Sequence, residues 1–65
     1  MLGDELRKAR LEKKMTQEAL SFASGVDRTY ISELENDHKS PTVDVLLRLC
    51  RAMEIKASKL VARIE

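Results

Sequence analysis

The chain has 65 residues, of which 43% are hydrophobic and 35% are charged, and its net charge is +1 at neutral pH. A chain this short is close to the lower size limit for independent folding, so we expect one domain over residues 1–65 and no separate catalytic or effector domain. The near-neutral charge argues against tight non-specific binding to nucleic acid, although the local placement of charge still permits specific binding.

The sequence carries no targeting or membrane-spanning signal. Its first residues, Met1 to Glu5, are acidic and lack the apolar run of a signal peptide. No stretch reaches the ~18 apolar residues that a membrane span needs. Cys50 is the only cysteine, so the chain cannot form an internal disulfide. We therefore expect a cytoplasmic protein with no membrane partner.

Leucine, alanine, lysine, glutamate and arginine dominate the composition, which is typical of an all-α domain rather than of a disordered chain. The expected helices cover residues 2–13, 17–24, 28–36, a segment that begins after Thr42, and residues 57–63. The inward face of the first helix carries Leu2, Leu6, Ala9 and Arg10. No strand alternation, repeat or low-complexity stretch interrupts this pattern.

Residues 16–36 read as two short helices joined by a tight turn. Thr16 is a good N-cap, and the first helix is expected to turn Ala19, Leu20 and Ala23 inward. Gly25 ends that helix, because glycine enters positive φ at little cost. The turn continues with Val26, which is expected to fill the corner, and Asp27, which is expected to cap the next helix.

The second of these helices separates an apolar side from a polar side. Ile31 and Leu34 point into the core, and the outer face carries Arg28, Thr29, Ser32, Glu33 and Asn36. Such a face is typical of a helix that reads DNA. Arg28 can donate a fork of hydrogen bonds to guanine, and Glu33 can accept from cytosine N4. The alternative interpretation is an ordinary solvated face.

The fourth helix follows Pro41, which ends any helix before it, and Thr42 is expected to cap it. Its apolar residues at helical spacing are Val43, Leu46, Leu47, Cys50 and Met53. This pattern predicts that the fourth helix is the most buried one and that Cys50 is a structural thiol in the core.

The segment 16–36 resembles the helix-turn-helix of the lambdoid-phage repressor and Cro family of transcriptional regulators (XRE-like). The matching residues are Gln17, Ser21, Gly25, Val26, Ile31, Ser32, Leu34 and Glu35, and the likeness continues through Pro41, Thr42 and Leu46 to cover roughly Leu6 to Leu60. The resemblance implies a compact five-helix bundle, a lambda-repressor-like DNA-binding domain. Two residues depart from the family pattern: Asp37 replaces the usual Gly after the third helix, and Lys56 replaces a capping Ser.

The resemblance also implies roles for residues outside the reading face. Gln17 would bind a phosphate beside the motif, and the loop residues Asn36, His38, Lys39 and Ser40 would lie along the phosphate backbone rather than form a merely solvated turn. Tyr30 would bond a phosphate or lean on the core. Arg10 and Glu35 would form a half-buried ion pair, the alternative being two separate surface charges.

The last helix has more apolar surface than a small domain needs. Ile55, Val61 and Ile64 would form either a homodimer seam, which we favour, or a simple lid on the core. Phe22 follows the inward Leu20 and should be partly exposed, either at the core edge or on a partner surface.

Together these features predict a regulator that binds double-stranded DNA at a two-fold operator as a homodimer. Phage-type repressors, restriction-modification controllers and antitoxins all fit. The alternative is a protein-interaction module that kept the fold and lost DNA binding, which the acids Asp27, Glu33 and Asp37 near the reading face motivate. An enzyme is not expected, because no nucleophile–base pair, metal cluster or phosphate-binding glycine loop is present. We expect no cofactor, metal or small-molecule ligand.

Overall fold

The helices of the computed structural model, which describes residues 2–64, follow the predicted order. They are α1 (Leu2–Glu12), α2 (Gln17–Ser24), α3 (Arg28–Glu35), α4 (Val43–Ala52) and α5 (Ala57–Ala62). The described residues contain no strand, so the prediction of an all-α bundle is confirmed. The first, third and fifth helices each end one residue earlier than predicted, and Asn36 is the C-cap of α3.

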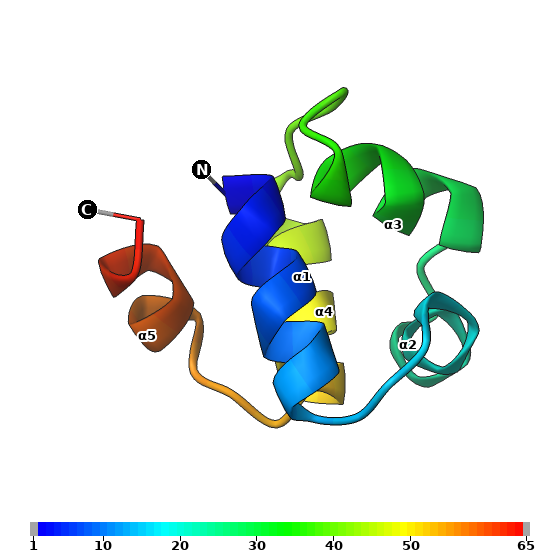
Figure 1. The fold of residues 1–65 in the computed structure, drawn as a ribbon, viewed down its shortest axis with the longest axis horizontal. Coiled ribbons are helices and arrows are strands. Elements are labelled where there is room, and N and C mark those ends of the chain that lie inside the picture. Colours follow the sequence, from blue (N-terminus) through cyan, green and yellow to red (C-terminus); the bar gives the residue numbers. More distant parts are fainter. Residues whose placement is uncertain (1, 65) are drawn as a thin grey trace.

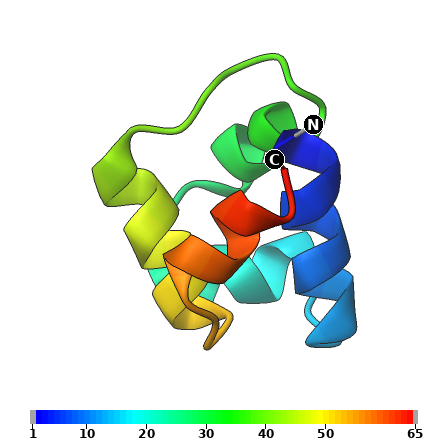
Figure 2. The same ribbon diagram turned by 90° about the vertical axis from the view of Figure 1, so that its left-hand side faces the viewer.

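The helices form two groups around α1 and α4, which lie in the middle of the molecule in Figure 1. On one side α2 and α3 pack against each other, with α3 on α1 and α2 on α4. On the other side α5 packs against both α1 and α4, and Figure 2 shows it in front of them. The motif and the last helix therefore occupy opposite ends of the domain.

Every helix contributes to one hydrophobic core. The buried apolar residues are Leu6, Ala9, Leu20, Val26, Ile31, Leu34, Leu49, Cys50, Met53 and Leu60. Several of them come from positions that helical spacing marks as inward, including Leu6, Leu20, Ile31 and Leu34. Because the chain is short, this single cluster holds all five helices together.

The expected inward stripe on α2 is only partly correct. Leu20 is fully buried, but Ala19 and Ala23 are exposed. The helix has eight residues and lies at the edge of the bundle, where one large side chain fills the space that faces the core. An alanine methyl group beside it is too short to reach the core, so the two alanines remain on the surface.

The expected apolar stripe on α4 is also wrong in part. Leu49 is fully buried although the predicted stripe omitted it, whereas Val43 and Leu47 are exposed. Apolar residues lie on several sides of α4, so their spacing alone does not show which side α2 and α5 cover. The helix with the most buried residues is α1, not α4. It buries Gly3, which lies against the C-terminus of α3, and Arg10, which pairs with Glu35.

Two of the three expected N-caps form. The hydroxyl oxygens of Thr16 and Thr42 accept hydrogen bonds from the backbone N–H groups of Ala19 and Val45, at 3.0 and 3.1 Å. Gly25 has φ +74°, as its place in the turn requires. Asp27 precedes α3 but makes no capping hydrogen bond, contrary to prediction. Its carboxylate still favours the positive end of the helix dipole through its charge.

Residues 2–64 contain neither a membrane-spanning helix nor a metal-binding cluster. No helix there is long and apolar enough to cross a membrane. The same residues contain no group of three or more His, Cys, Asp or Glu side chains that could hold a metal ion.

Replacement of Leu49 tests the corrected core. Leu49→Ala should lower the free energy of unfolding by about 2–5 kcal/mol, because it opens a cavity in a tightly packed cluster. The matched variant Leu47→Ala, two residues earlier in α4 but exposed, should cost about 1 kcal/mol or less. Urea unfolding followed by circular dichroism measures both. Equal losses of stability in the two variants would mean that Leu47 contributes to the core, as the predicted apolar stripe indicates.

Candidate nucleic-acid interface

The motif presents the polar face of α3 to solvent. Arg28, Thr29 and Asn36 are exposed, and Ser32 and Glu33 are half-buried. Ile31 and Leu34 on the opposite side are fully or almost fully buried, which fixes the rotation of the helix about its axis. The structure therefore brings the five predicted reading residues to one side of α3. Their contact with DNA stays a prediction.

Arg28 is available for recognition. It lies in the first turn of α3, and the ion pairs formed within residues 2–64 do not include it. A guanidinium group is always charged and presents its donors in a planar fork, which matches two acceptors on one base edge. Arg28 thus has the position, the charge and the donor geometry that readout of a guanine requires.

The loop after α3 folds back onto the reading helix. Lys39 Nζ lies 3.6 Å from Glu33 Oε1 and 5.9 Å from the centroid of the Tyr30 ring. The Tyr30 hydroxyl donates to the backbone oxygen of Ser40 at 3.5 Å, while its ring packs against the core. Of the two alternatives for Tyr30, the structure supports packing on the core. Lys39 and Ser40 remain exposed beside α3, as does His38.

A buried ion pair holds α3 against α1. Arg10 Nε donates to Glu35 Oε2 at 2.7 Å, and Arg10 Nη2 donates to Glu35 Oε1 at 3.0 Å. Arg10 Nη1 also donates to the Met15 carbonyl at 2.8 Å, so the guanidinium fork bonds to the end of α3 and to the segment before α2. Both side chains are buried, and the predicted pair is confirmed.

Gln17 joins this network, which the sequence did not indicate. Its Nε2 donates to Glu35 Oε1 at 3.1 Å. The resemblance to the family implies only a phosphate contact for Gln17. The first residue of α2 is now linked to the last residue of α3, so the network spans three helices. The only available signal was the shared location of Gln17 and Glu35 at the outer ends of the two motif helices.

The C-terminus of α3 meets the N-terminus of α1. Asp37, which replaces the usual Gly of the family, adopts the left-handed conformation with φ +57°, and its Oδ1 accepts the Gly3 backbone N–H at 3.0 Å. A Cβ atom on Gly3 would lie 2.6 Å from the Glu35 carbonyl oxygen and 2.7 Å from that of Leu34. Gly3 is therefore needed for the close approach, and the hydrogen bond explains why Asp can replace the usual Gly.

The hydrophobic residues proposed for a dimer seam differ in exposure. Ile55 is half-buried against the core, whereas Val61 and Ile64 on the last helical segment are 40% and 39% exposed. Arg63 anchors this segment to α1, because its Nε donates to Glu5 Oε1 at 2.9 Å. Phe22 is 94% exposed, so it does not cover the edge of the core.

Cys50 is a buried free thiol in α4. Burial raises its pKa from the ordinary value, because the charged thiolate would lose its hydration. The thiol therefore stays protonated and poorly nucleophilic at neutral pH, as a core residue should.

A family model of helix-turn-helix proteins matches residues 6–60. The chain belongs to this helix-turn-helix family. The residues matched include all of α2, α3 and α4, so the buried ion pair and the reading face both lie within the region that defines the family. The resemblance seen in the sequence and the predicted fold class are confirmed.

Three known proteins are similar to this helix-turn-helix domain. The HTH-type transcriptional regulator PrpR of Mycobacterium tuberculosis is 40% identical over 55 residues, which are 85% of this chain but only 11% of PrpR. The structure of the restriction-modification controller protein C.AhdI from Aeromonas hydrophila matches with a TM-score of 0.88 at 34% identity, covering 91% of this chain and 89% of C.AhdI. The DNA-binding domain of the P22 C2 repressor matches with a TM-score of 0.88 at 30% identity, covering 94% and 80%.

Replacement of Arg10 tests the energetic role of the buried pair. Arg10→Met should lower the free energy of unfolding by about 3–5 kcal/mol, because Glu35 keeps a buried charge without its partner. The double variant Arg10→Met/Glu35→Leu should recover much of this loss. Chemical denaturation of the three proteins measures both effects.

The exposed pair of Arg48 and Asp44, 3.3 Å apart on α4, provides the control. Arg48→Met should change stability by about 0.5 kcal/mol or less, because solvent screens an exposed pair. If the double variant were less stable than Arg10→Met alone, the loss would come from packing and not from an uncompensated charge.

Proposed function

We propose that this chain is a sequence-specific DNA-binding transcriptional regulator that places α3 in the major groove. The observation that carries the proposal is the polar face of α3, on a helix fixed by Arg10 and Glu35. Arg28 in its first turn forms no ion pair with any of residues 2–64. A fixed helix loses little further freedom on binding, so its side chains can select a base sequence. The regulator, controller and repressor among its relatives support the same class over a module without DNA binding.

Each residue on the outer face of α3 has a base contact that suits its chemistry. Arg28 donates to guanine O6 and N7, and Glu33 accepts from cytosine N4, while Thr29 and Ser32 contact either kind of base edge. Lys39, at 3.6 Å from Glu33, offsets part of the negative charge that Glu33 would bring close to the phosphates. The proposed half-site therefore contains at least one G·C pair.

The remaining site residues position the domain on the phosphate backbone. They are Gln17, Asn36, His38, Lys39 and Ser40. Gln17 is suited to this role because its amide is held at the start of α2, where backbone N–H groups favour an anion. Contacts of this kind fix register and carry little sequence information.

We further propose that two copies bind a two-fold operator through a homodimer interface at Ile55, Val61 and Ile64. Val61 lies in α5, which packs on the side of α1 and α4 opposite α2 and α3 (Figure 1), and Ile55 and Ile64 flank that helix in sequence. The long axis of the domain measures 28 Å. A dimer joined at the α5 end would separate its two α3 helices by a distance comparable to the ~34 Å between half-sites one turn apart.

The proposed mechanism is positional and not enzymatic. The dimer would regulate a gene in the cytoplasm by blocking or recruiting polymerase at its operator. Both the repressor and the controller types among the relatives fit this behaviour.

Selection of bound sequences from a random pool of duplex DNA tests the function directly. We expect an enriched two-fold sequence with half-sites about one helical turn apart, and affinity that falls steeply with salt. Recovery of the input pool without enrichment, at low and moderate salt, would overturn sequence-specific binding.

Arg28→Ala tests the reading face. It should weaken binding to the selected site by about 1–3 kcal/mol and relax preference at one base pair, with a smaller effect on random DNA. Helical content should not change, because Arg28 is exposed. The exposed α1 residue Arg7 supplies the control, since Arg7→Ala removes the same charge away from α3. Equal losses on selected and random DNA would reassign Arg28 to the phosphate backbone.

Val61→Asp tests the dimer seam. Sedimentation of the wild type at micromolar concentration should reveal a two-chain species, and the charged variant should sediment as a monomer because an unpaired carboxylate would be buried in the interface. Leu11→Asp, at an exposed apolar residue of α1, should leave the dimer intact. A wild type that remains monomeric both free and on DNA would contradict the proposal.

A further inference from the structure

The outer side of α2 carries apolar residues that the fold does not use. Ala19, Phe22 and Ala23 are exposed, and Phe22 is 94% exposed. Their spacing of three and four residues places them on adjacent positions of one helix surface, which we term the α2 face. Because α2 packs on α3 and α4 through its other sides, none of the described helices covers this face.

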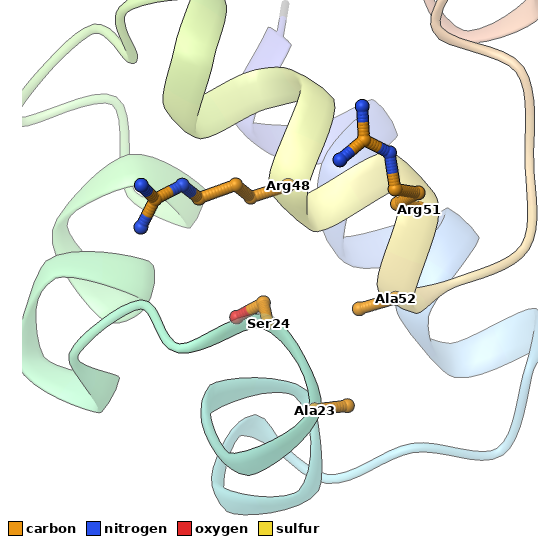
Figure 3. Close-up of a pocket in the computed structure, with 5 residues that line it drawn as sticks. All are labelled: Ala23, Ser24, Arg48, Arg51 and Ala52. Atoms are coloured by element: carbon orange, nitrogen blue, oxygen red, sulfur yellow. The ribbon is translucent and has the colours of Figure 1, made fainter.

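A cationic hollow adjoins the α2 face. Ala23, Ser24, Arg48, Arg51 and Ala52 line a space of about 300 Å³ between the end of α2 and α4. Figure 3 shows the two arginine side chains leaving α4 in different directions, with Ala23 and Ser24 across the hollow. Ala23 belongs to both surfaces, so the apolar face and the hollow are continuous.

The charge of the hollow is largely uncompensated. Arg51 takes no part in the ion pairs formed within residues 2–64. Arg48 is bonded to Asp44 only through an exposed pair, with side chains 54% and 74% accessible, and such a pair exchanges readily for another carboxylate. These two guanidinium groups line a hollow that is continuous, through Ala23, with the face that carries Phe22. The combination suits an acidic partner with an apolar side chain.

The α2 face is separate from the surfaces already assigned. All but one of the residues proposed to contact DNA lie on α3 and the loop after it. The exception is Gln17 on α2, whose side chain donates to Glu35 and not toward the α2 face. The proposed dimer seam lies at the opposite end of the domain, beyond α1 and α4 (Figure 1). A homodimer formed through α5 would therefore leave the α2 face open.

We propose that the α2 face and the hollow beside it form a docking surface for a second protein, which presents an acidic segment with an exposed apolar side chain. The apolar side chain packs on Phe22, and carboxylates of the segment pair with Arg48 and Arg51. This inference does not depend on the proposed DNA sequence or on the dimer, because it uses neither set of residues.

Selection from a random-peptide display library tests the surface. The full chain is the bait, and Phe22→Ala/Arg51→Glu is the counter-selection bait. We expect enriched peptides that combine Asp or Glu with Phe, Leu, Ile or Trp. Enrichment of basic peptides, or of the same peptides on both baits, would overturn the proposal.

The most enriched peptide is then titrated into isotope-labelled protein. Amide resonances of Phe22, Ala23, Ser24, Arg51 and Ala52 should shift, and each single variant, Phe22→Ala or Arg51→Glu, should weaken binding about tenfold or more. The matched controls are Leu11→Ala for the apolar residue and Arg7→Glu for the charge, both on the surface of α1. They should leave peptide affinity within about twofold.

Measurements of self-association and of DNA binding test two other occupants of this face, a second copy of the chain and DNA. If Phe22→Ala abolished self-association, a second copy of the chain would be the occupant. If Phe22→Ala and Arg51→Glu both weakened binding to the selected DNA more than their α1 controls, DNA would be the occupant. Either result would overturn docking of an acidic protein segment. Retained dimerisation and DNA binding, with lost peptide binding, supports it and leaves the proposed regulatory function unaffected.

Discussion

The buried pair of Arg10 and Glu35 is the interaction on which the arrangement of the motif depends. It joins α1 to the end of α3 by two short charge-assisted hydrogen bonds, and its fork also reaches the Met15 carbonyl. Such a pair adds little net stability compared with an apolar contact, but it tolerates only a narrow range of geometries. Its main effect is therefore to fix the angle at which α3 presents its outer face.

Two other contacts restrict the same helix. Gln17 connects the start of α2 to Glu35, and Asp37 bonds to the first turn of α1 through the Gly3 N–H. The absence of a side chain on Gly3 lets α1 approach the final carbonyls of α3 closely. All three contacts act at the C-terminal end of α3, which leaves its N-terminal turn, with Arg28, free to extend outward.

Three surfaces of this small domain differ in chemical character. The outer side of α3 and the following loop carry the polar and charged groups suited to DNA, and the α5 end carries Val61 and Ile64. The outer side of α2 carries Phe22, and the hollow beside it is lined by Arg48 and Arg51 of α4. Since the core uses one or a few residues from each helix, every helix also keeps exposed residues.

The sequence by itself determined the helix order, the turn at Gly25, the inward positions of Ile31 and Leu34, and the family, because these follow from local periodicity, cap residues and fixed spacing. The tertiary structure decided which of several apolar residues on α4 is buried, and it left Ala19 and Ala23 in solvent. It also brought Gln17 to Glu35 and Gly3 to Asp37. These outcomes depend on how closely helices that are distant in sequence approach each other, and no local pattern encodes that distance.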